Sequence, residues 1–326
     1  MTIERADDTT AAPTRMRIAD LHPDLRRAYR WFPRPQVRHG WQRRILKGIF
    51  AMIPEPKPTD EVRFERIGFA TPGTGVRVFT PAGGGSGGAL LWFHGGGLVI
   101  GAAASDDRFC AQLAVELDIV VAAVDYRLAP EHPFPAPLDD CAAAWQWLQD
   151  AASARGIDPD RIAIGGQSAG GGLAAALAQR LHDSGGPQPV AQLLYCPMLD
   201  DRTAARRELD AVRHFAWTNR DNLVGWSSYL AGPPGADDVP DHAVPARRAD
   251  LAGLPPAWIG VGDIDLFHDE DLAYAAALRA AGVECTVDVV PGAPHGFETI
   301  ARDAEVATAF HARAQAWLEE RLTATR

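Results

Sequence analysis

Short apolar runs alternate with helix-length amphipathic stretches along most of the chain beyond residue 89. The runs lack polar alternation, which is typical of strands covered on both faces of a mostly parallel sheet. They occupy residues 90–93, 119–124, 162–164, 193–195, 258–261 and 286–290. Helices are predicted between and after them, at residues 105–117, 139–151, 169–183, 269–281 and 303–322. Strand and helix in this order predict an α/β fold with a doubly wound sheet.

Two segments depart from this alternation. Residues 20–52 have a helical pattern, in which Trp41, Ile45, Ile49 and Met52 form one apolar stripe. Residues 200–250 contain several prolines and many charges, which fits an insertion between two strands better than another strand–helix unit. We expect the two segments to form a helical cap over the carboxyl edge of the sheet, where α/β proteins bind ligands.

Composition narrows the class of protein. The 326 residues are 47% hydrophobic and 23% charged, as in a globular protein with a large core. The net charge of −10 argues against a nucleic-acid partner held by phosphate contacts. Four scattered cysteines without metal-ligand spacing predict reduced, buried thiols, and no apolar run is long enough to span a membrane. The polar N-terminus lacks a signal-peptide pattern, so a cytoplasmic location is expected.

A G-x-S-x-G pentapeptide centred on Ser168 lies between a predicted strand and a predicted helix. A serine on such a sharp turn is held out at the edge of the sheet, and the flanking glycines avoid crowding. The start of the helix also presents free N–H groups to an anion forming there. The alternative, an ordinary N-cap serine before a glycine-rich helix, is weaker in this context.

A second glycine-rich segment, His94-Gly95-Gly96-Gly97, directly follows the strand at 90–93. Acyl transfer builds negative charge on a carbonyl oxygen, and backbone N–H groups stabilise that charge only where the chain approaches closely. Consecutive glycines permit this approach. By itself the segment would fit a plain tight turn, but beside the serine elbow it predicts an oxyanion hole.

His295 and a group of acids complete the candidate site. His295 lies in a Pro/Gly-flanked loop after the last predicted strand, where it is a candidate general base. One acid after the strand at 258–261 is expected to orient the histidine, and the others to cap the helix near Asp269; the candidates are Asp263, Asp265, Asp269 and Glu270. The order serine, acid, histidine is that of α/β-hydrolases.

The sequence resembles the hormone-sensitive-lipase-like esterases, a branch of the α/β-hydrolase fold. The resemblance rests on H-G-G-G-L-V-I-G at 94–101, D-Y-R-L-A-P-E-H-P-F-P-A-P at 125–137, G-Q-S-A-G-G at 166–171 and P-H-G-F at 294–297. It implies a mostly parallel central sheet with helices on both faces and a helical cap. The expected organisation is an N-terminal arm with cap helices at 1–53, a catalytic domain at 54–199 and 251–326, and a cap insertion at 200–250.

The resemblance also implies residue roles. Ser168 corresponds to the nucleophile, His295 to the base and Asp265, in preference to Asp263, to the acid. Backbone N–H groups of Gly96, Gly97 and Ala169 correspond to the oxyanion hole. Gln167 departs from the aspartate common beside the nucleophile, and the segment containing Asp125, Arg127 and Glu131 is expected to brace the oxyanion loop through ion pairs. Cap residues expected near the substrate are Trp41, Ile45 and Trp217.

The expected function is hydrolysis of small-to-medium acyl carboxylic esters through an acyl-enzyme, without a cofactor or metal. An amidase, peptidase or lactonase with the same three residues is an alternative that only a substrate panel separates. Two further alternatives are a non-catalytic small-molecule receptor on this fold and a lipase acting at an oil interface. The expected partner is a small ester, without stable membrane insertion, and a homodimer through an edge strand is compatible with the family.

Overall fold

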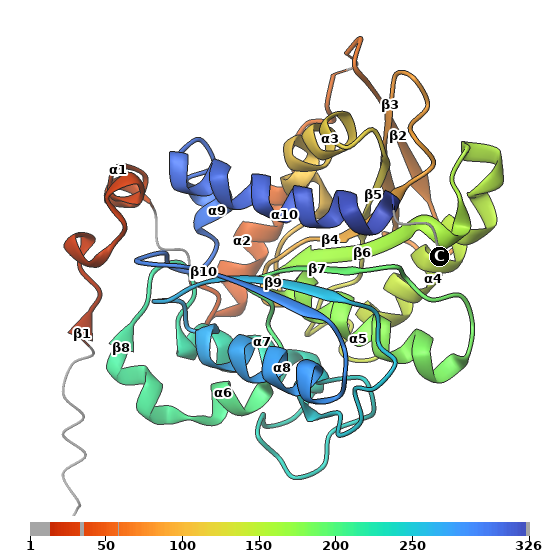
Figure 1. Cartoon of the computed structure of the whole chain (residues 1–326). Helices are drawn as coiled ribbons and strands as arrows, with labels where there is room; N and C mark the ends of the chain where they lie inside the picture. Colours follow the sequence, from red (N-terminus) through yellow and green to blue (C-terminus); the bar gives the residue numbers. More distant parts are fainter. Residues whose placement is uncertain (1–13, 33–35, 58, 324–326) are drawn as a thin grey trace, which may run out of the picture.

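The structure is a computed structural model and describes residues 14–32, 36–57 and 59–323, so that part of the predicted N-terminal arm lies outside the described residues. Its main strands are β2 (Val62–Gly68), β3 (Gly75–Pro81), β4 (Ala89–Phe93), β5 (Val120–Asp125), β6 (Ile162–Gln167), β7 (Gln192–Tyr195), β9 (Ala257–Gly262) and β10 (Cys285–Val290). Within the described ranges these eight strands form one sheet in the order β10-β9-β7-β6-β4-β5-β3-β2 (Figure 1). From β5 to β10 all neighbouring strands are parallel, whereas β3 is antiparallel to both β2 and β5.

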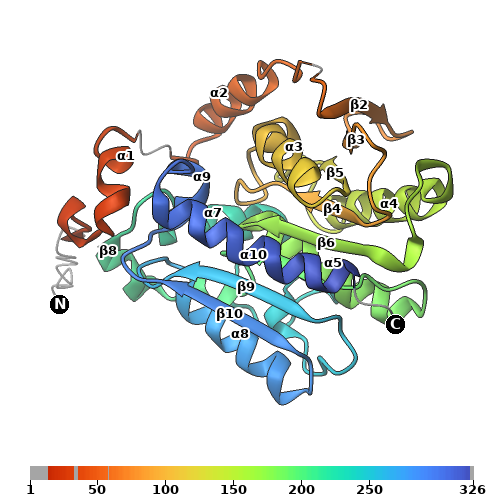
Figure 2. The same ribbon diagram turned by 45° about the horizontal axis from the view of Figure 1, so that its top comes forward.

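Helices cover both faces of this sheet, as Figure 2 shows from a second angle. The helices are α1 (Arg26–Trp31), α2 (Gly40–Ala51), α3 (Asp107–Glu116), α4 (Ala136–Ala151), α5 (Ala169–Ser184), α6 (Asp201–Ala205), α7 (Asn219–Leu230), α8 (His268–Ala280), α9 (Phe297–Ile300) and α10 (Glu305–Thr323). Short 3-10 turns occupy residues 18–20, 23–25, 103–106, 153–155, 159–161, 207–211 and 245–247. The predicted α/β class, with helices on both faces of a mostly parallel sheet, is confirmed.

The core consists of two apolar layers, one on each face of the sheet. Successive residues of a strand point to opposite faces. Leu91 and Phe93 of β4 therefore pack in the layer that includes α4, α5 and α8. Leu90 and Trp92 pack in the layer that includes α3 and α10. The β4–β6 register pairs Phe93 with Gly166, which brings the ends of these two strands together at the carboxyl edge.

The hydrophobic pattern is incomplete in two places. The helical pattern over residues 20–52 does not mark the division of this segment into 3-10 turns, α1 and α2. The sequence has Pro33 and Pro35 between the two helices, and proline inside a helix removes a hydrogen bond and clashes with the preceding turn. The hairpin of β2 and β3 was not predicted, although apolar and polar residues alternate from Val62 to Glu65, as in a half-buried edge strand.

The segment between β7 and β9, where the sequence predicts an insertion, contains α6, α7 and the short strand β8 (Val212–Arg213). β8 pairs in parallel with β1 (Thr14–Arg15), so the N-terminal segment and the insertion lie side by side in both views (Figures 1 and 2). In the part of the chain that the structure describes, every helix is too short or too polar to cross a bilayer.

Candidate active site

Ser168 lies on a sharp turn between β6 and the first residue of α5. Its backbone has φ 55° and ψ −119°, a conformation that a non-glycine residue rarely adopts and that is found at strained functional turns. The side chain is only 5% exposed. This geometry is that of the strand–turn–helix elbow that the G-x-S-x-G pattern predicts.

The glycines on either side of Ser168 are required by close backbone packing. A side chain at Gly170 would overlap the carbonyl oxygen of Phe93, and one at Gly166 would overlap the backbone of Gly170. The elbow is therefore pressed against the end of β4. Because β4 leads directly into the His94–Gly97 loop, this packing holds that loop beside the serine.

His295 connects the serine to an acid. Its Nε2 atom lies 2.8 Å from the Ser168 hydroxyl, and its Nδ1 atom lies 2.9 Å from Oδ2 of Asp265. Because a carboxylate only accepts hydrogen bonds, Nδ1 donates to Asp265 and Nε2 is free to accept from the serine. Asp265 is held in turn by the backbone N–H of Phe267 at 2.9 Å.

The choice between the two candidate acids follows from their contacts. Asp265 is 6% exposed and contacts the imidazole of His295, which is 7% exposed. Asp263 is exposed and instead accepts the backbone N–H of Gly292 at 2.6 Å. The structure thus brings Ser168, His295 and Asp265 together and leaves Asp263 outside the group.

Burial and charge act in opposite directions on His295. Burial lowers its pKa, whereas the charge of Asp265, the hydrogen bond to that carboxylate and the charge of Glu298 raise it, and the net pKa lies above the ordinary value. The edge of the imidazole ring also meets the Phe267 ring, with centroids 5.0 Å apart. The ring is therefore fixed in position and poised to receive a proton.

The His94–Gly97 loop approaches the serine closely. A Cβ atom at Gly95 would lie 3.5 Å from Cβ of Ser168. Gly96 and Gly97 have φ of 125° and 60°, which side chains disfavour, and a side chain at Gly96 would overlap the carbonyl oxygen of Ile100. Ala169 begins α5, where a backbone N–H has no acceptor within the helix. These three residues therefore flank Ser168 on the loop and helix sides.

The loop is braced by a ring contact and not mainly by ion pairs, which corrects one expectation. Tyr126 stacks on His94 with ring centroids 4.2 Å apart and donates its hydroxyl to the carbonyl oxygen of His94 at 2.6 Å. Arg127 pairs with Asp140 of α4, and Glu131 pairs with Lys47 of α2. Asp125, the third expected residue, accepts the backbone N–H of Ala103, at the start of the 3-10 turn that follows the loop.

The acids after Asp265 are not helix caps, contrary to the prediction. The start of α8 has no side-chain cap. Glu270 is buried and accepts the backbone N–H of Leu199 at 2.8 Å, and burial raises its pKa to about 8. Asp271 is fully buried, and neither carboxyl oxygen has a hydrogen-bond partner among the described residues. The sequence pattern does not distinguish such buried acids from exposed ones.

The expected cap residues have different surroundings. Trp217 is buried, and its ring occupies the space that a side chain at Gly97 would need. Trp41 and Ile45 are 61% and 55% exposed, so the structure does not place them in a buried pocket. The opposite side of α2 packs partly buried Leu46 and Phe50 against the core.

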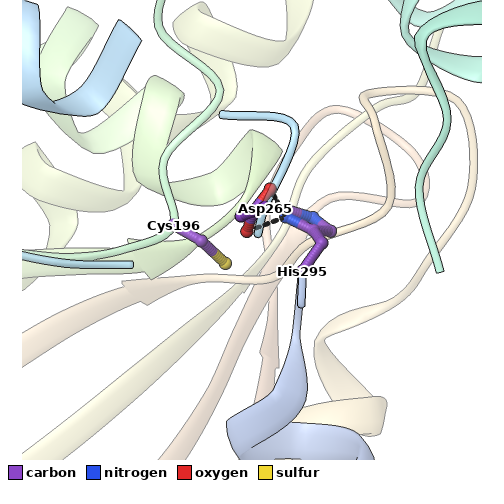
Figure 3. Close-up of side chains that lie close together, drawn as sticks. All are labelled: Cys196, Asp265 and His295. Atoms are coloured by element: carbon purple, nitrogen blue, oxygen red, sulfur yellow. Dashed lines mark hydrogen bonds and ion pairs between the residues drawn. The ribbon is translucent and has the colours of Figure 1, made fainter. Parts of the chain in front are cut away.

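All four cysteines are buried and free, as expected. One of them, Cys196, follows β7 and lies beside the site (Figure 3). A ligand atom of Cys196, one of Asp265 and one of His295 lie within 4.8 Å of one another. Among the residues that the structure describes, this is the group of three side chains whose donor atoms could hold a metal ion.

Comparisons with known proteins agree with this geometry. A family model described as the alpha/beta hydrolase fold matches residues 90–299. Among solved structures, a bacterial heroin esterase is 35% identical, with a TM-score of 0.86 over 94% of this chain and 99% of that chain. Esterase LipW from Mycobacterium marinum is 31% identical, with a TM-score of 0.81 over 94% of this chain and 98% of its own.

A curated relative, the esterase LipI of Mycobacterium tuberculosis, is 39% identical over 192 residues, or 59% of each chain. An ethyl acetate hydrolase of Pseudomonas putida is 35% identical over 194 residues, 59% of this chain and 60% of that protein. The match therefore spans about three fifths of the length of these curated relatives. The resemblance to hormone-sensitive-lipase-like esterases, expected from four motifs, is confirmed.

Proposed function

The chain belongs to the alpha/beta hydrolase fold family, and from that premise we propose that it hydrolyses carboxylic esters through an acyl-enzyme formed on Ser168. The observation that carries the proposal is the continuous path from the Ser168 hydroxyl to Nε2 of His295 at 2.8 Å and from Nδ1 to Asp265 at 2.9 Å. The names of the relatives, which are esterases, support the same reaction class.

In the proposed reaction, Ser168 attacks the ester carbonyl carbon while its proton passes to Nε2 of His295. Asp265 holds the imidazole in this orientation and stabilises the imidazolium that forms. The imidazolium then protonates the leaving alcohol. Water, deprotonated by the same imidazole, attacks the acyl-serine and releases the carboxylic acid. Each proton leaves and returns through one nitrogen, so no other acid or base is required.

The developing oxyanion is stabilised by the backbone N–H groups of Gly96, Gly97 and Ala169. Donors fixed in place before the reaction stabilise charge without having to reorganise, which makes them a large part of the catalytic effect. The close approach of Gly95 to Ser168 supports this assignment, because even a Cβ atom at Gly95 would be in van der Waals contact with the serine side chain.

The substrate is a small-to-medium acyl ester. Trp217, in contact with the glycine loop, limits the space beside the oxyanion site and so limits the length of the acyl group. In this proposal residues 1–53 and 200–250 form the cap, while residues 54–199 and 251–326 form the catalytic domain. The exposed stripe containing Trp41 and Ile45 covers the substrate when the cap closes.

A panel of p-nitrophenyl esters of increasing acyl length, measured with and without a serine-directed phosphonate, tests this function. We expect turnover of acetate to hexanoate esters and complete loss after labelling, with the label on Ser168 by peptide mass spectrometry. A matched amide and a lactone separate the esterase from the alternatives with the same three residues. Preference for either, or a label on another residue, would overturn the proposal.

A further inference from the structure

Cys196 turns its side chain toward the Asp265–His295 pair (Figure 3). The residue follows β7 with an unusual φ of 35°, and its backbone N–H donates to Gly260 of the neighbouring strand at 2.7 Å. The sulfur is thereby fixed at the inner side of the site, where it is 3% exposed. The proposed reaction gives this thiol no role.

Thiolate, imidazole nitrogen and carboxylate are the donors that proteins use to bind zinc, at bond lengths that set tetrahedral ligand atoms about 3.3–3.8 Å apart. The ligand atoms of Cys196, Asp265 and His295 already lie within 4.8 Å of one another. Nδ1 of His295 and Oδ2 of Asp265, which lie 2.9 Å apart, would have to separate slightly, and the Cys196 sulfur would have to approach them.

The surroundings favour a cation. Asp271 is fully buried with both carboxyl oxygens unpaired among the described residues, and burial raises the pKa of this carboxyl group well above its ordinary value. A cation bound nearby would favour the ionised form of such a buried carboxyl group. Arg and Lys side chains are not among the groups whose charges act on Cys196.

We propose that Cys196, Asp265 and Nδ1 of His295 form a binding site for a thiophilic divalent cation such as Zn²⁺. The bound cation acts as a reversible inhibitor and not as a cofactor. The inhibitory part rests on the proposed function, whereas binding of the ion does not. Cys196 differs from the other three cysteines, which belong to no group of three His, Cys, Asp or Glu donors among the described residues.

The protons balance as follows. Burial raises the pKa of the Cys196 thiol well above its ordinary value, so the sulfur gives up one proton to solvent when the metal binds. Asp265 changes its partner without changing its charge. The metal replaces the hydrogen on Nδ1 of His295, and that proton moves to Nε2. Nε2 then has no lone pair to accept the Ser168 proton, which explains why the bound ion would stop the reaction.

Direct binding is tested with Co²⁺, which gives a sulfur-to-metal charge-transfer band only when a thiolate is a ligand. We expect one equivalent of Co²⁺ to produce this band in the wild-type protein. The absorbance is followed until it is constant, because a buried site can load slowly. Added Zn²⁺ should displace Co²⁺ and abolish the band. Cys196→Ser should lose the band, whereas Cys285→Ser, a change at another buried free cysteine, should keep it. No sulfur band in wild type, or the same band in Cys196→Ser, overturns the site.

Inhibition is tested by titrating Zn²⁺ into p-nitrophenyl acetate hydrolysis and then adding EDTA. Loss of an outer-shell partner alone weakens metal binding by about 10- to 100-fold, so both Cys196→Ser and Cys196→Ala should raise the half-inhibitory Zn²⁺ concentration by at least about 100-fold. Equal sensitivity of wild type and both variants contradicts the assignment. A protein that binds Co²⁺ through sulfur but hydrolyses no ester would overturn the proposed function and leave the metal site standing.

Discussion

The side-chain amide of Gln167 donates a hydrogen bond of 2.8 Å to Oε1 of Glu298. This bond joins the residue before Ser168 to the turn that follows His295, and the Gln167 side chain packs closely there: a Cβ at Gly296 would lie 3.3 Å from its amide nitrogen. Glu298 is 3% exposed, and burial raises its pKa. A neutral amide donor, in place of an acid at position 167, satisfies this buried carboxyl group without a second negative charge.

Gln167→Asp should therefore make stability depend on pH. The variant places two carboxyl groups in one buried site, so at least one keeps a proton in the folded protein and has a raised pKa there. The stabilising protonated form is present at low pH and is lost as pH rises above the ordinary carboxyl value of about 4. We expect the free energy of unfolding, measured by urea titration, to be close to that of the wild type at pH 5. At pH 8 it should be lower than that of the wild type by about 1–3 kcal/mol.

Gln146→Asp is the matched control for this variant. Gln146 also donates its amide to a carboxylate, Asp150, at 2.8 Å, but on the exposed side of α4. Water screens the like charges there, so the change in stability should stay within about 0.5 kcal/mol at both pH values. Equal pH dependence of the two variants would refute the role assigned to burial of Glu298.

Ser168→Ala should lower kcat for p-nitrophenyl acetate by about a million-fold, with residual catalysis from the oxyanion hole. The loss follows because Ser168 is the hydroxyl that contacts Nε2 of His295 among the hydrogen bonds of the described residues. Ser184→Ala removes an exposed hydroxyl that bonds only the Arg180 carbonyl and should leave kcat unchanged. Retention of a tenth of the activity by Ser168→Ala would exclude this residue as the nucleophile.

Asp265→Asn and Asp263→Asn should separate orientation of the base from loop support. An amide at position 265 holds the imidazole in the wrong tautomer, which lowers kcat by about 10⁴-fold in comparable sites. At position 263 the change weakens one hydrogen bond to Gly292. We expect kcat near wild type there, with a stability loss of about 1 kcal/mol in a urea titration. The reverse pattern would transfer the acid role to Asp263.

The pH profile of kcat/KM should fall on the acid side with a midpoint above about 6.5, the ordinary histidine value. Burial opposes protonation of His295, but Asp265 and Glu298 raise its pKa further than burial lowers it. Below that pKa the imidazolium cannot accept the Ser168 proton. A pH-stat assay, which avoids the titration of nitrophenol, measures the profile. A flat profile from pH 5 to 9 is incompatible with a histidine base.

Trp217→Ala should widen the range of acyl groups. Loss of the ring beside Gly97 frees space in which each added methylene of the substrate is worth about tenfold or more in kcat/KM. We expect the octanoate-to-acetate ratio of p-nitrophenyl ester hydrolysis to rise by at least about tenfold. Trp31→Ala, at a position that is 83% exposed and lies outside the stripe containing Trp41 and Ile45, should change this ratio less. An unchanged ratio in Trp217→Ala would exclude the ring from the substrate pocket.

The parallel half of the sheet was predictable because its strands are buried on both faces and appear as uninterrupted apolar runs. The hairpin of β2 and β3 was not, because it lies at the edge and alternates polar and apolar residues over a short stretch. Periodicity also gave residues 20–52 a helical pattern without marking the break between α1 and α2. The apolar stripe from Trp41 to Met52 lies wholly after Pro33 and Pro35, so it indicates α2 and does not report on the segment before it.

The residues that meet at the site were identified from motifs because the chemistry restricts which types can stand there. Ser168, His295 and Asp265 each follow a strand of the same parallel sheet. Because the carboxyl ends of parallel strands lie at one edge of the sheet, all three residues are expected at that edge. Side-chain partners beyond them were not predictable. Nothing local in the sequence indicates that Gln167 reaches Glu298, 131 residues away, or that the buried carboxyl oxygens of Asp271 have no hydrogen-bond partner among the described residues.

The position of β10 has a consequence for inactivation. This strand is the outermost of the sheet, and β9 is its one partner among the described strands, yet the turn after it carries His295. Peripheral segments detach at a lower free energy than the whole molecule unfolds. Hydrolysis should therefore be lost in mild denaturant while the far-UV circular dichroism signal of the helices persists. Dilution of the denaturant should restore hydrolysis rapidly, because only β10 has to pair again with β9.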